Sequence, residues 1–449
     1  MNLLVTDLTS SKPSTKLSSN ERLFYSAYRW FVWPLLRFVF RLLSFFMPKI
    51  AKGLELRESV NGRAPWIKLL PPAPPTVWFH CASGEFEYAK PVITLLKCER
   101  PDVKIVVTYF SPTYSDQIRK FSGVDWVVPL PWDSPWPLSQ FLTSYRPSTL
   151  LIARTDVWPE MARQACVRNL RTALFSATLT AHSGRTKGLG RWATRSTLNQ
   201  LDEIFCVSND DVKEFSALGL TRPPVLQQGD TRYDQVLARL ESPKVIREDL
   251  FLKSVVGTRE LLICGSTWPQ DEAVLIPALA EIKESVCGVL VPHEPTLTHL
   301  NELEENIRSV GLLPVRYSDP DAAIKLREAS TCLVIDQTGI LAELYLKGRW
   351  AFVGGSFRKT VHSVMEPLAA GCLTFVGPLH TNNREAVEFQ TLKINETLSF
   401  VTAISTAAEL VAKIKLAQAS GDQKEPIKKA VRSRTGSSRR LVDWIIQDL

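Results

Sequence analysis

Side chains that could do chemistry gather in this chain directly after short apolar runs. Each cluster joins a small residue to a carboxylate, hydroxyl, imidazole or guanidinium group. Parallel sheets bind ligands beyond the carboxyl ends of their strands, so these clusters indicate binding edges. A carboxylate at such an edge, such as Glu85, is a candidate general base. The clusters are 83–85 (Ser-Gly-Glu), 155–156 (Thr-Asp), 229–232 (Gly-Asp-Thr-Arg), 265–267 (Gly-Ser-Thr), 292–294 (Pro-His-Glu), 336–339 (Asp-Gln-Thr-Gly), 354–356 (Gly-Gly-Ser) and 377–378 (Gly-Pro).

The apolar runs alternate with stretches of helical pattern from residue 75 onward. Runs that are buried on both faces and separated by helices predict parallel strands in βαβ units. There are too many runs for one ordinary sheet, so we expect an α/β fold of two doubly wound domains that face each other across a cleft. The boundary is expected near residues 232–249. The runs are 76–81, 103–109, 126–130, 150–153, 172–175, 203–207 and 225–228 in the first domain, and 260–264, 288–291, 313–316, 331–335, 350–353 and 372–376 in the second.

Several function classes are disfavoured by motifs that the sequence lacks. It contains no G-x-G-x-x-G fingerprint and no Walker A sequence, which argues against a hydride-transfer enzyme and a P-loop ATPase. It also contains no H-E-x-x-H and no G-x-S-x-G. The 8 cysteines stand singly, and several lie in apolar runs. They indicate small buried hydrophobic residues rather than disulfides or a zinc site.

Positive charge is concentrated at the N-terminus. Residues 1–60 carry nine Lys/Arg against four Asp/Glu, so +5 (9 − 4) of the formal net charge of +8 lies there. This asymmetry suggests an acidic partner surface, either lipid or nucleic acid. Residues 1–20 are rich in Ser, Thr and Lys and are expected to form a disordered tail.

Residues 21–50 have the pattern of an amphipathic helix. Four arginines fall within an arc of about 120°, opposite aromatic and aliphatic residues. They are Arg22, Arg29, Arg37 and Arg41. We expect a helix, kinked at Pro34, that lies in a membrane interface with its basic face toward anionic headgroups. The alternative is a basic amphipathic helix docked on the protein itself.

Ordered motifs along the chain resemble those of a known family. Residues 78–87, Trp-Phe-His-Cys-Ala-Ser-Gly-Glu-Phe-Glu, resemble the H-A-x-S-x-G-E-F-E turn of bacterial Kdo (3-deoxy-D-manno-octulosonic acid) transferases. The similarity runs from about residue 22 to the C-terminus. The further matches are 130–136 (L-P-x-D-x-P), 155–159 (T-E-x-W-P), 229–234 (G-[ND]-x-[KR]-[FY]-D), 265–272 (a form of the nucleotide-domain loop), and 352–356, 362–367 and 377–378 (the block GGS, HNxxEP, GP).

The resemblance implies a GT-B fold of two Rossmann-like domains facing a cleft, with an N-terminal membrane-associated helix. Residues 51–235 would form the acceptor domain and 245–449 the CMP-sugar domain. The implied activity is that of an inverting glycosyltransferase, which moves Kdo from CMP-Kdo to a lipid A precursor in lipopolysaccharide biosynthesis. Such an enzyme would need no cofactor and no metal. Its partners would be CMP-Kdo, the lipid A precursor and anionic lipid, not nucleic acid. It would be monotopic on the cytoplasmic face of the inner membrane.

The resemblance also implies roles for individual residues. Glu85 corresponds to the general base, which deprotonates the acceptor hydroxyl. Asp156 and Arg232 correspond to positions that stabilise the transition state. From position alone, Glu85 could equally be a first-turn helix residue favoured by the helix dipole, and Asp156 and Arg232 could be structural ion-pair residues. The residues implied to bind CMP are Pro292, His293, Thr338, Gly339, Ile340, His362, Ser363 and Glu366.

The chain departs from the family pattern mainly at the donor site. His293 stands where the family has Arg, so its phosphate contact is expected to weaken between about pH 6 and 8. Ile340 replaces the acid of the family's M-G-E, and Ser363 replaces the Asn of H-N. The turn before Glu85 is one residue shorter than usual. Two alternatives therefore stay open, namely a GT-B protein that uses another sugar nucleotide and a lipid- or nucleotide-binding protein without turnover.

Overall fold

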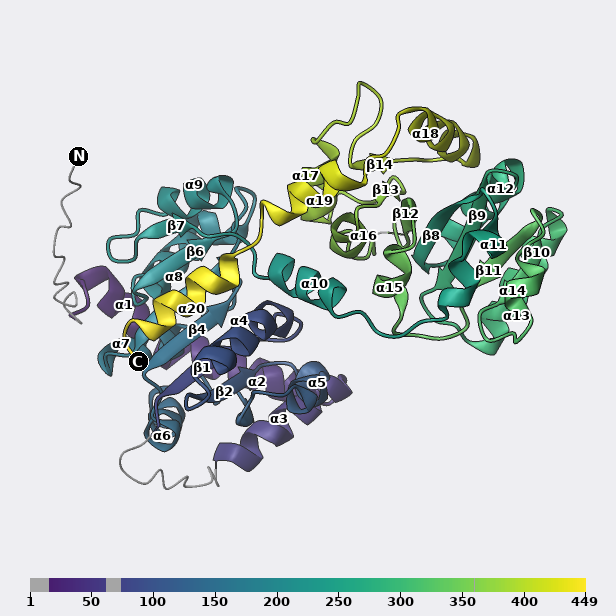
Figure 1. Ribbon diagram of the computed structural model, residues 1–449. Coiled ribbons are helices and arrows are strands. Elements are labelled where there is room, and N and C mark those ends of the chain that lie inside the picture. The colour runs from purple at the N-terminus through teal and green to yellow at the C-terminus, as the bar shows by residue number, and fades with distance from the viewer. Residues whose placement is uncertain (1–15, 62–73, 359) are drawn as a thin grey trace, which may run out of the picture. The chain divides into compact units, whose positions relative to one another are not determined.

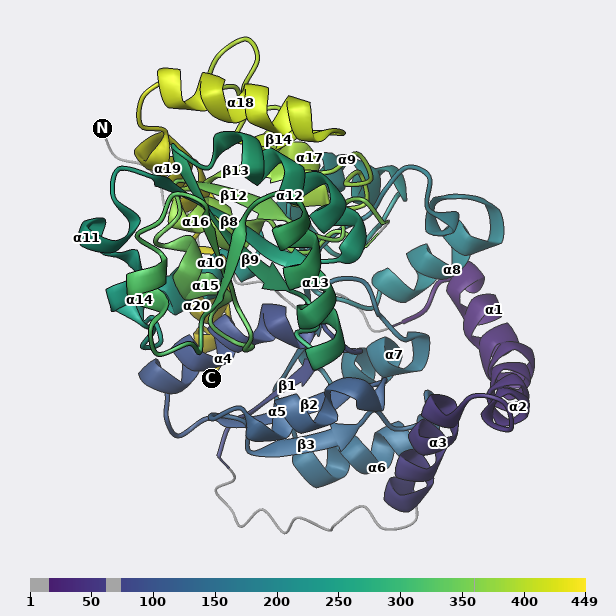
Figure 2. The ribbon, with the colours of Figure 1, turned by 90° about the vertical axis from the view of Figure 1, so that its right-hand side faces the viewer.

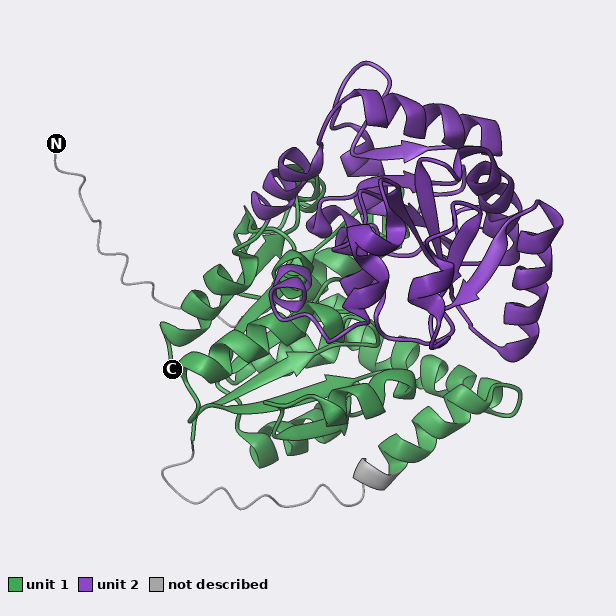
Figure 3. Ribbon diagram, turned by 45° about the vertical axis from the view of Figure 1, so that its right-hand side comes forward, with its two compact units in different colours: residues 1–235, 435–449 green, residues 236–434 purple. Residues whose placement is uncertain are grey.

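The computed structural model describes residues 16–61, 74–358 and 360–449. It comprises two compact units, drawn as a ribbon in Figure 1 and coloured separately in Figure 3. Unit 1 contains Met1–Gln235 and Thr435–Leu449, and unit 2 contains Val236–Arg434.

The C-terminal helix, α20 (Ser437–Ile446), belongs to unit 1 rather than to the second domain predicted as 245–449. Its apolar face is buried in the core on one side of the first sheet. Asp234 holds its start, because the Asp234 carboxylate accepts the N–H groups of Gly436 at 2.6 Å and Ser438 at 2.7 Å. A carboxylate at a helix N-terminus satisfies backbone donors that would otherwise lack a partner.

Unit 1 is built on a parallel sheet of seven strands in the order β3-β2-β1-β4-β5-β6-β7. The predicted runs of the first domain form these strands. The order reverses between β1 and β4, which are adjacent although β2 and β3 lie between them in sequence. Such a switch point is where open α/β sheets bind ligands. The strands are β1 (Thr76–His80), β2 (Lys104–Tyr109), β3 (Trp126–Pro129), β4 (Thr149–Ala153), β5 (Arg171–Ala177), β6 (Glu203–Cys206) and β7 (Val225–Gln227).

Helices cover both faces of this sheet, and apolar cores lie on each side of it. Local signals begin several of them. Ser208 and Asp211 form a capping box at the start of α9, and proline occupies the first turn of α6 and of α7. The helices are α4 (Phe86–Glu99), α5 (Ser115–Lys120), α6 (Pro135–Tyr145), α7 (Pro159–Val167), α8 (Gly188–Leu198), α9 (Asn209–Ala217) and α10 (Arg232–Glu241), which crosses the boundary between the units, with 3₁₀ turns at Pro112–Tyr114 and Gly184–Thr186.

Unit 2 repeats the plan with the strand order β10-β11-β9-β8-β12-β13-β14. Its switch point lies between β8 and β12. The three-residue β14 was absent from the predicted runs, because it is too short to give a periodic signal. The strands are β8 (Glu260–Thr267), β9 (Val286–Pro292), β10 (Leu313–Arg316), β11 (Thr331–Val334), β12 (Trp350–Val353), β13 (Leu373–Val376) and β14 (Val401–Ala403).

The helices of unit 2 connect these strands and pack on the sheet. They are α11 (Lys253–Val256), α12 (Pro269–Ile282), α13 (Leu297–Ser309), α14 (Ala322–Lys325), α15 (Leu341–Tyr345), α16 (Met365–Ala370), α17 (Arg384–Gln390), α18 (Ala407–Ala419) and α19 (Lys424–Arg432), with a 3₁₀ turn at Glu248–Phe251. The expected cleft between the domains concerns the placement of one unit against the other and stays a prediction.

The N-terminal segment forms consecutive helices at the periphery of unit 1 (Figure 2). They are α1 (Ser19–Ala27), a π-helical turn (Tyr28–Val32), α2 (Trp33–Ser44) and α3 (Pro48–Asn61). Ser18 and Glu21 form a capping box, so helix begins at Ser19, inside the predicted disordered tail of residues 1–20. Residues 1–15 of that tail lie outside the described residues. Among the helices that the structure describes, none combines the length and apolarity needed to cross a membrane.

One arginine of the basic face is also bound by the protein. Arg29 makes two hydrogen bonds, of 2.8 and 2.9 Å, to the carboxylate of Glu160, which is 0% exposed, while the Arg29 side chain stays 38% exposed. The guanidinium of Arg37 lies 5.3 Å from the ring centroid of Trp132. Arg22, Arg37 and Arg41 are also exposed. The orientation of this face toward lipid headgroups therefore stays a prediction.

A second, apolar face of the same helices is left exposed. Its members form one stripe along the π-helical turn and α2 and continue to the residues that follow α2. We call this the outer stripe: Trp30, Phe31, Leu35, Phe38, Leu42, Phe45 and Phe46, whose exposed fractions range from 51% to 81%. The opposite, inner face buries Phe24, Tyr25, Tyr28 and Trp33 against Trp132. The alternative of a helix docked on its own protein therefore describes the inner face.

Substituting Arg29 tests whether the inner face is part of the fold. Arg29→Met should lower the free energy of unfolding by roughly 2–4 kcal/mol, because it leaves Glu160 buried without its cation. Arg41→Met, at an exposed position of α2, should change it by less than about 0.5 kcal/mol. Urea unfolding of both variants measures the difference. Equal free energies of unfolding for the two variants would show that the N-terminal helices dock on unit 1 without this ion pair.

Candidate functional site

Glu85 lies at the switch point of unit 1, in the turn between β1 and α4. The Ser83 N–H donates to its Oε2 at 2.7 Å, which fixes one carboxylate oxygen against the turn. The side chain is half-buried. Gly84 is needed beside it, because a Cβ there would lie 3.2 Å from the Tyr114 hydroxyl. The turn thus presents a partly exposed carboxylate at the carboxyl edge of the sheet.

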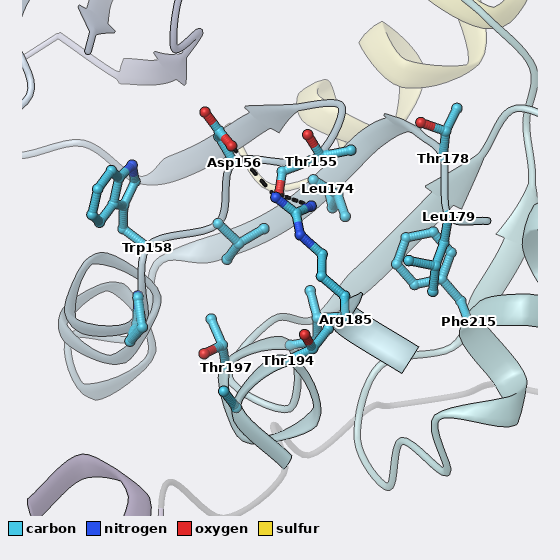
Figure 4. Close-up of a pocket in the computed structure, with 14 residues that line it drawn as sticks. Thr155, Asp156, Trp158, Leu174, Thr178, Leu179, Arg185, Thr194, Thr197 and Phe215 are labelled. Atoms are coloured by element: carbon cyan, nitrogen blue, oxygen red, sulfur yellow. Dashed lines mark hydrogen bonds and ion pairs between the residues drawn. The ribbon is translucent and has the colours of Figure 1, made fainter. Parts of the chain in front are cut away.

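Asp156 follows β4, the strand adjacent to β1, and it is electrostatically coupled to Glu85. Burial raises the pKa of Asp156, and the negative charge of Glu85 raises it further. Arg185 opposes this shift, with its Nη2 3.7 Å from the Asp156 carboxylate, and it donates from Nη1 to the Thr155 carbonyl at 3.0 Å. Figure 4 shows the Arg185 side chain reaching toward both residues. The structure therefore brings together two of the three predicted catalytic residues.

Arg232 is held by Asp230, which belongs to the same motif, and lies against α4. Its Nη2 donates to Asp230 Oδ2 at 2.7 Å, and the Asp230 side chain is only 3% exposed. Its guanidinium carbon lies 4.5 Å from the ring centroid of Tyr88, which is one turn beyond Glu85 on α4. Arg154 approaches the same ring at 5.6 Å. Two guanidinium groups thus flank one aromatic ring next to the turn that carries Glu85.

Glu87 occupies a different environment from Glu85. Its Oε1 accepts a hydrogen bond from Lys90 Nζ at 2.5 Å, three residues further along α4. This neutralised pair contrasts with Glu85, whose carboxylate accepts a hydrogen bond from the backbone N–H of Ser83. The shortened turn, which could have rotated Glu87 into the site, leaves Glu85 as the carboxylate that interacts with Asp156.

Sequence analysis did not assign Arg154, Arg185 or Tyr88 to this site. Arg154 directly follows β4 and adopts the left-handed conformation, with φ = 71°. That conformation is uncommon outside glycine and often marks functional positions. Its place after a predicted strand was the available signal. Nothing in the spacing of Arg185 or Tyr88 pointed to Asp156 or Arg232, because these pairs form only when separate loops and helices meet.

Three aromatic rings stack at the switch point of unit 2. The ring centroids of Trp268 and His293 lie 4.8 Å apart, and those of His293 and His362 lie 4.4 Å apart. Arg358 covers the Trp268 ring at 3.9 Å. These residues follow β8, β9 and β12, which are neighbours in the sheet. Two of the predicted donor-binding residues are thus brought together, on a platform that includes a tryptophan not predicted to take part.

The protonation state of His362 follows from its neighbours. Burial, together with the positive charges of the nearby His293 and Arg358, lowers its pKa to about 4. The Trp268 indole N–H can only donate, and it donates to His362 Nε2 at 3.4 Å. His362 is therefore neutral near pH 7, with its proton on Nδ1, where it can serve as a hydrogen-bond donor.

The remaining predicted donor residues have mixed surroundings. Ser363 Oγ accepts the Met365 N–H at 3.3 Å, at the start of α16. Glu366 pairs with Arg239 at 2.7 Å. A ligand hydroxyl would therefore compete with existing partners at both side chains. Pro292 is buried at the end of β9.

The predicted phosphate-binding turn at 338–340 is less suited to an anion than the sequence suggested. Gly339 adopts φ = 88°, and its carbonyl accepts a hydrogen bond from Lys244 Nζ at 2.8 Å. Thr338 is exposed, whereas Ile340 is 7% exposed. The helix that follows, α15, has 5 residues, so its dipole is weak. The roles of Thr338, Gly339 and Ile340 stay predictions.

The glycine-rich loop after β12 is shaped by a buried carboxylate. Asp271 is 0% exposed and accepts the N–H groups of Gly355 at 2.8 Å and Phe357 at 3.2 Å. A Cβ on Gly354 would lie 2.1 Å from the Ser266 carbonyl oxygen, so only glycine fits this close approach. The matched motifs 265–272 and 352–356 thus form one packed unit around the ring platform.

The chain matches known proteins in both sequence and fold. A family model described as 3-deoxy-D-manno-octulosonic-acid transferase (kdotransferase) matches residues 57–235. The 3-deoxy-D-manno-octulosonic acid transferase of Haemophilus influenzae is 26% identical over 394 residues, covering 84% of this chain and 88% of that protein. The protein of the same name from Aquifex aeolicus is 24% identical over 319 residues, covering 70% and 79%.

The fold is shared with a solved sugar-nucleotide enzyme. The UDP-GlcNAc 2-epimerase of Neisseria meningitidis, solved bound to UDP-GlcNAc, has a TM-score of 0.57 and 12% identity, covering 83% of this chain and 99% of that one. The likeness at this identity concerns the two-domain α/β fold alone. The match to the family model, in contrast, spans the turn with Glu85, the loop with Asp156 and the motif with Arg232, and the similar transferases come from several bacteria. In the part of the chain that contains these motifs, the sequence is therefore similar to the 3-deoxy-D-manno-octulosonic acid (Kdo) transferases.

Proposed function

We propose that the protein is an inverting glycosyltransferase that moves Kdo from CMP-Kdo to a hydroxyl of a lipid A precursor. The observation that carries this proposal is the position of Glu85 and Asp156 after the adjacent strands β1 and β4, where their charges interact. The similarity of this part of the chain to Kdo transferases supports it. The first unit would bind the acceptor and the second the CMP group.

The proposed chemistry is a single displacement. Glu85 takes the proton of the acceptor hydroxyl while the hydroxyl oxygen bonds to the anomeric carbon of Kdo. The bond from that carbon to the phosphate oxygen breaks, and CMP leaves with the electron pair. Asp156 lies close enough to Glu85 for their charges to interact, so it would stabilise positive charge that develops on the sugar. Arg232 and Arg154 would offset negative charge on the reacting groups.

The ring platform supports the donor part of the proposal. The neutral His362 would donate from Nδ1 to the CMP phosphate, and Arg358 supplies a positive charge on the same platform. His293 is exposed and stacks on the His362 ring, and it would add a second contact to the phosphate. Ser363 and Glu366 would contribute after their present partners are displaced.

The outer stripe supports a membrane location, which we propose as monotopic attachment to the cytoplasmic face of the inner membrane. An exposed row of aromatic and aliphatic side chains is typical of surfaces that enter the lipid interface. Lys49 and Lys52, both exposed at the start of α3, could meet anionic headgroups beside it. The inner face meanwhile anchors these helices to unit 1, so the apolar surface is held rigidly.

Glu85→Gln should separate the proposed base from its neighbour. The amide keeps the size of the side chain but removes its basicity, so turnover of CMP-Kdo with a lipid A precursor should fall by about 10²–10⁴-fold. CMP affinity and melting temperature should change little. Product formation is followed by mass spectrometry, which also identifies the sugar transferred.

The matched control is Glu87→Gln, which should leave turnover within about threefold, because Glu87 is paired with Lys90. Loss of turnover in Glu87→Gln alone would reverse the assignment. A parent protein that binds CMP without turnover would favour the alternative of a binding protein without enzymatic activity. Transfer from a different sugar nucleotide would favour the alternative of a GT-B enzyme with another donor.

His293→Arg should raise the affinity for CMP, because a guanidinium is always charged and can contact phosphate through two N–H groups. His362→Gln should lower the affinity, because it removes the ring that stacks on His293. Calorimetric titration with CMP measures both variants against the parent protein. An unchanged affinity in His293→Arg would contradict a phosphate contact at this position.

Replacing two members of the outer stripe tests the membrane proposal. Phe38→Ser with Leu42→Ser should weaken binding to vesicles of phosphatidylethanolamine and phosphatidylglycerol by about 10–100-fold, since apolar burial drives interfacial binding. Leu189→Ser, at an 80%-exposed position on α8, is the matched control and should bind as the parent does. Vesicle flotation measures both. Unchanged flotation of the double variant would contradict the proposed surface.

A further inference from the structure

A pocket of about 280 Å³ opens in unit 1 beside Asp156, between the ends of β4 and β5 and the helices α8 and α9 (Figure 4). Its mouth is polar. The side chains of Asp156 and Arg185 there are 40% and 46% exposed. Its interior is lined by apolar side chains, with Leu174 at 1% and both Leu198 and Phe215 at 3% exposure, and by the uncharged side chains of Thr178, Thr194 and Thr197. The pocket is therefore amphipathic along its depth.

The position of the pocket links it to the proposed reaction. Asp156 lies at its mouth and interacts electrostatically with Glu85. A ligand that filled the pocket would thus place the group at its outer end close to the proposed base. The pocket differs in this from the cavities of a packed core, which have no polar opening.

The size and lining favour a flexible apolar chain over a sugar ring. An apolar cavity of about 150 Å³ accommodates a molecule the size of benzene, so this pocket suits an apolar segment of nearly twice that size. Sugar sites need several directed polar groups to satisfy the ring hydroxyls. Here Leu174, Leu198 and Phe215 form the deep part, and the charged groups are confined to the mouth.

The wall of the pocket is continuous with the lipid-facing part of unit 1. One side of α8 lines the pocket with Thr194 and Leu198. Its neighbouring residue Trp192 packs against Phe24 of α1, with ring centroids 5.3 Å apart. The helices that follow Phe24 carry the outer stripe. One helix therefore separates the pocket from the surface proposed to meet the membrane.

We propose that this pocket binds an apolar acyl segment of the lipid acceptor, with the polar part of that acceptor outside the mouth and beside Glu85. The inference rests on the proposed function and adds to it a subsite that selects acylated acceptors. Burial of the acyl segment would help to position the acceptor hydroxyl. The pocket would then select acylated acceptors, while Glu85 would take part in the reaction itself.

The test fills the pocket in the full-length protein. Thr194→Phe adds an aromatic ring to the α8 wall, and Leu189→Phe adds the same ring to α8 at an 80%-exposed position outside the pocket lining. Each variant is assayed for Kdo transfer to a fully acylated lipid A precursor and to a deacylated, water-soluble form of the same disaccharide. Thr194→Phe should raise KM for the acylated acceptor at least tenfold and change kcat/KM for the deacylated one less than twofold. Leu189→Phe should behave as the parent protein with both acceptors.

Three results would overturn the proposal. Equal losses with both acceptors would indicate a sugar subsite or a folding defect, and melting temperatures distinguish these. No effect of Thr194→Phe on either acceptor would show that the pocket is not used. If the parent protein transfers no sugar, the proposed function fails. The pocket is then tested separately, by a binding measurement that does not depend on turnover. Decyl maltoside below its micellar concentration should raise the melting temperature of the parent but not of Thr194→Phe, and an equal rise in both would refute the pocket.

Discussion

The buried carboxylate of Asp133 is the interaction on which the working end of unit 1 depends. It is 2% exposed, and burial raises its pKa to about 7. Its oxygens accept the Tyr28 hydroxyl at 2.6 Å and the N–H groups of Glu160 and Met161 at 3.0 and 2.8 Å. A carboxylate is costly to bury unless such donors surround it, so removing any one of them would leave a penalty behind. The satisfied group joins the loop after β3, the start of α7 and the π-helical turn after α1.

Through this junction the buried Asp133 helps to position Asp156, the carboxylate proposed to act in the reaction. The loop before α7 carries Asp156, and Asp133 fixes where α7 begins. Glu160, in the first turn of α7, is held by Arg29 from the π-helical turn that follows α1. The N-terminal helices are therefore a support for the loop that faces Glu85, and their outer stripe is a second surface on the same rigid body.

Unit 2 uses the same device with different residues. Asp271 is buried and accepts the N–H groups of Trp268, Gly355 and Phe357. It thereby ties the start of α12 to the loop after β12, and those segments carry the rings that stack around His293. In each unit a buried aspartate accepts backbone N–H groups from two segments near a switch point and holds these segments together. The same segments carry the side chains that a ligand could contact.

The sequence by itself determined the two sheets, their parallel strands and the position of Glu85. Apolar runs of strand length between amphipathic stretches have few other solutions, and a carboxylate directly after such a run must lie at the carboxyl edge. It could not locate β14 or the return of α20 to unit 1, because one is too short for a periodic signal and the other depends on Asp234 and on a core elsewhere. The arginine arc of residues 21–50 was predicted as one face, but a helical wheel does not say which of its side chains find partners in the protein. Only the tertiary structure supplied Glu160, 131 residues from Arg29, as the partner of one of these arginines. The meeting of Arg185 with Asp156, and of Trp268 with His362, was decided in the same way, since side chains on separate loops become neighbours only when the strands that carry them are paired.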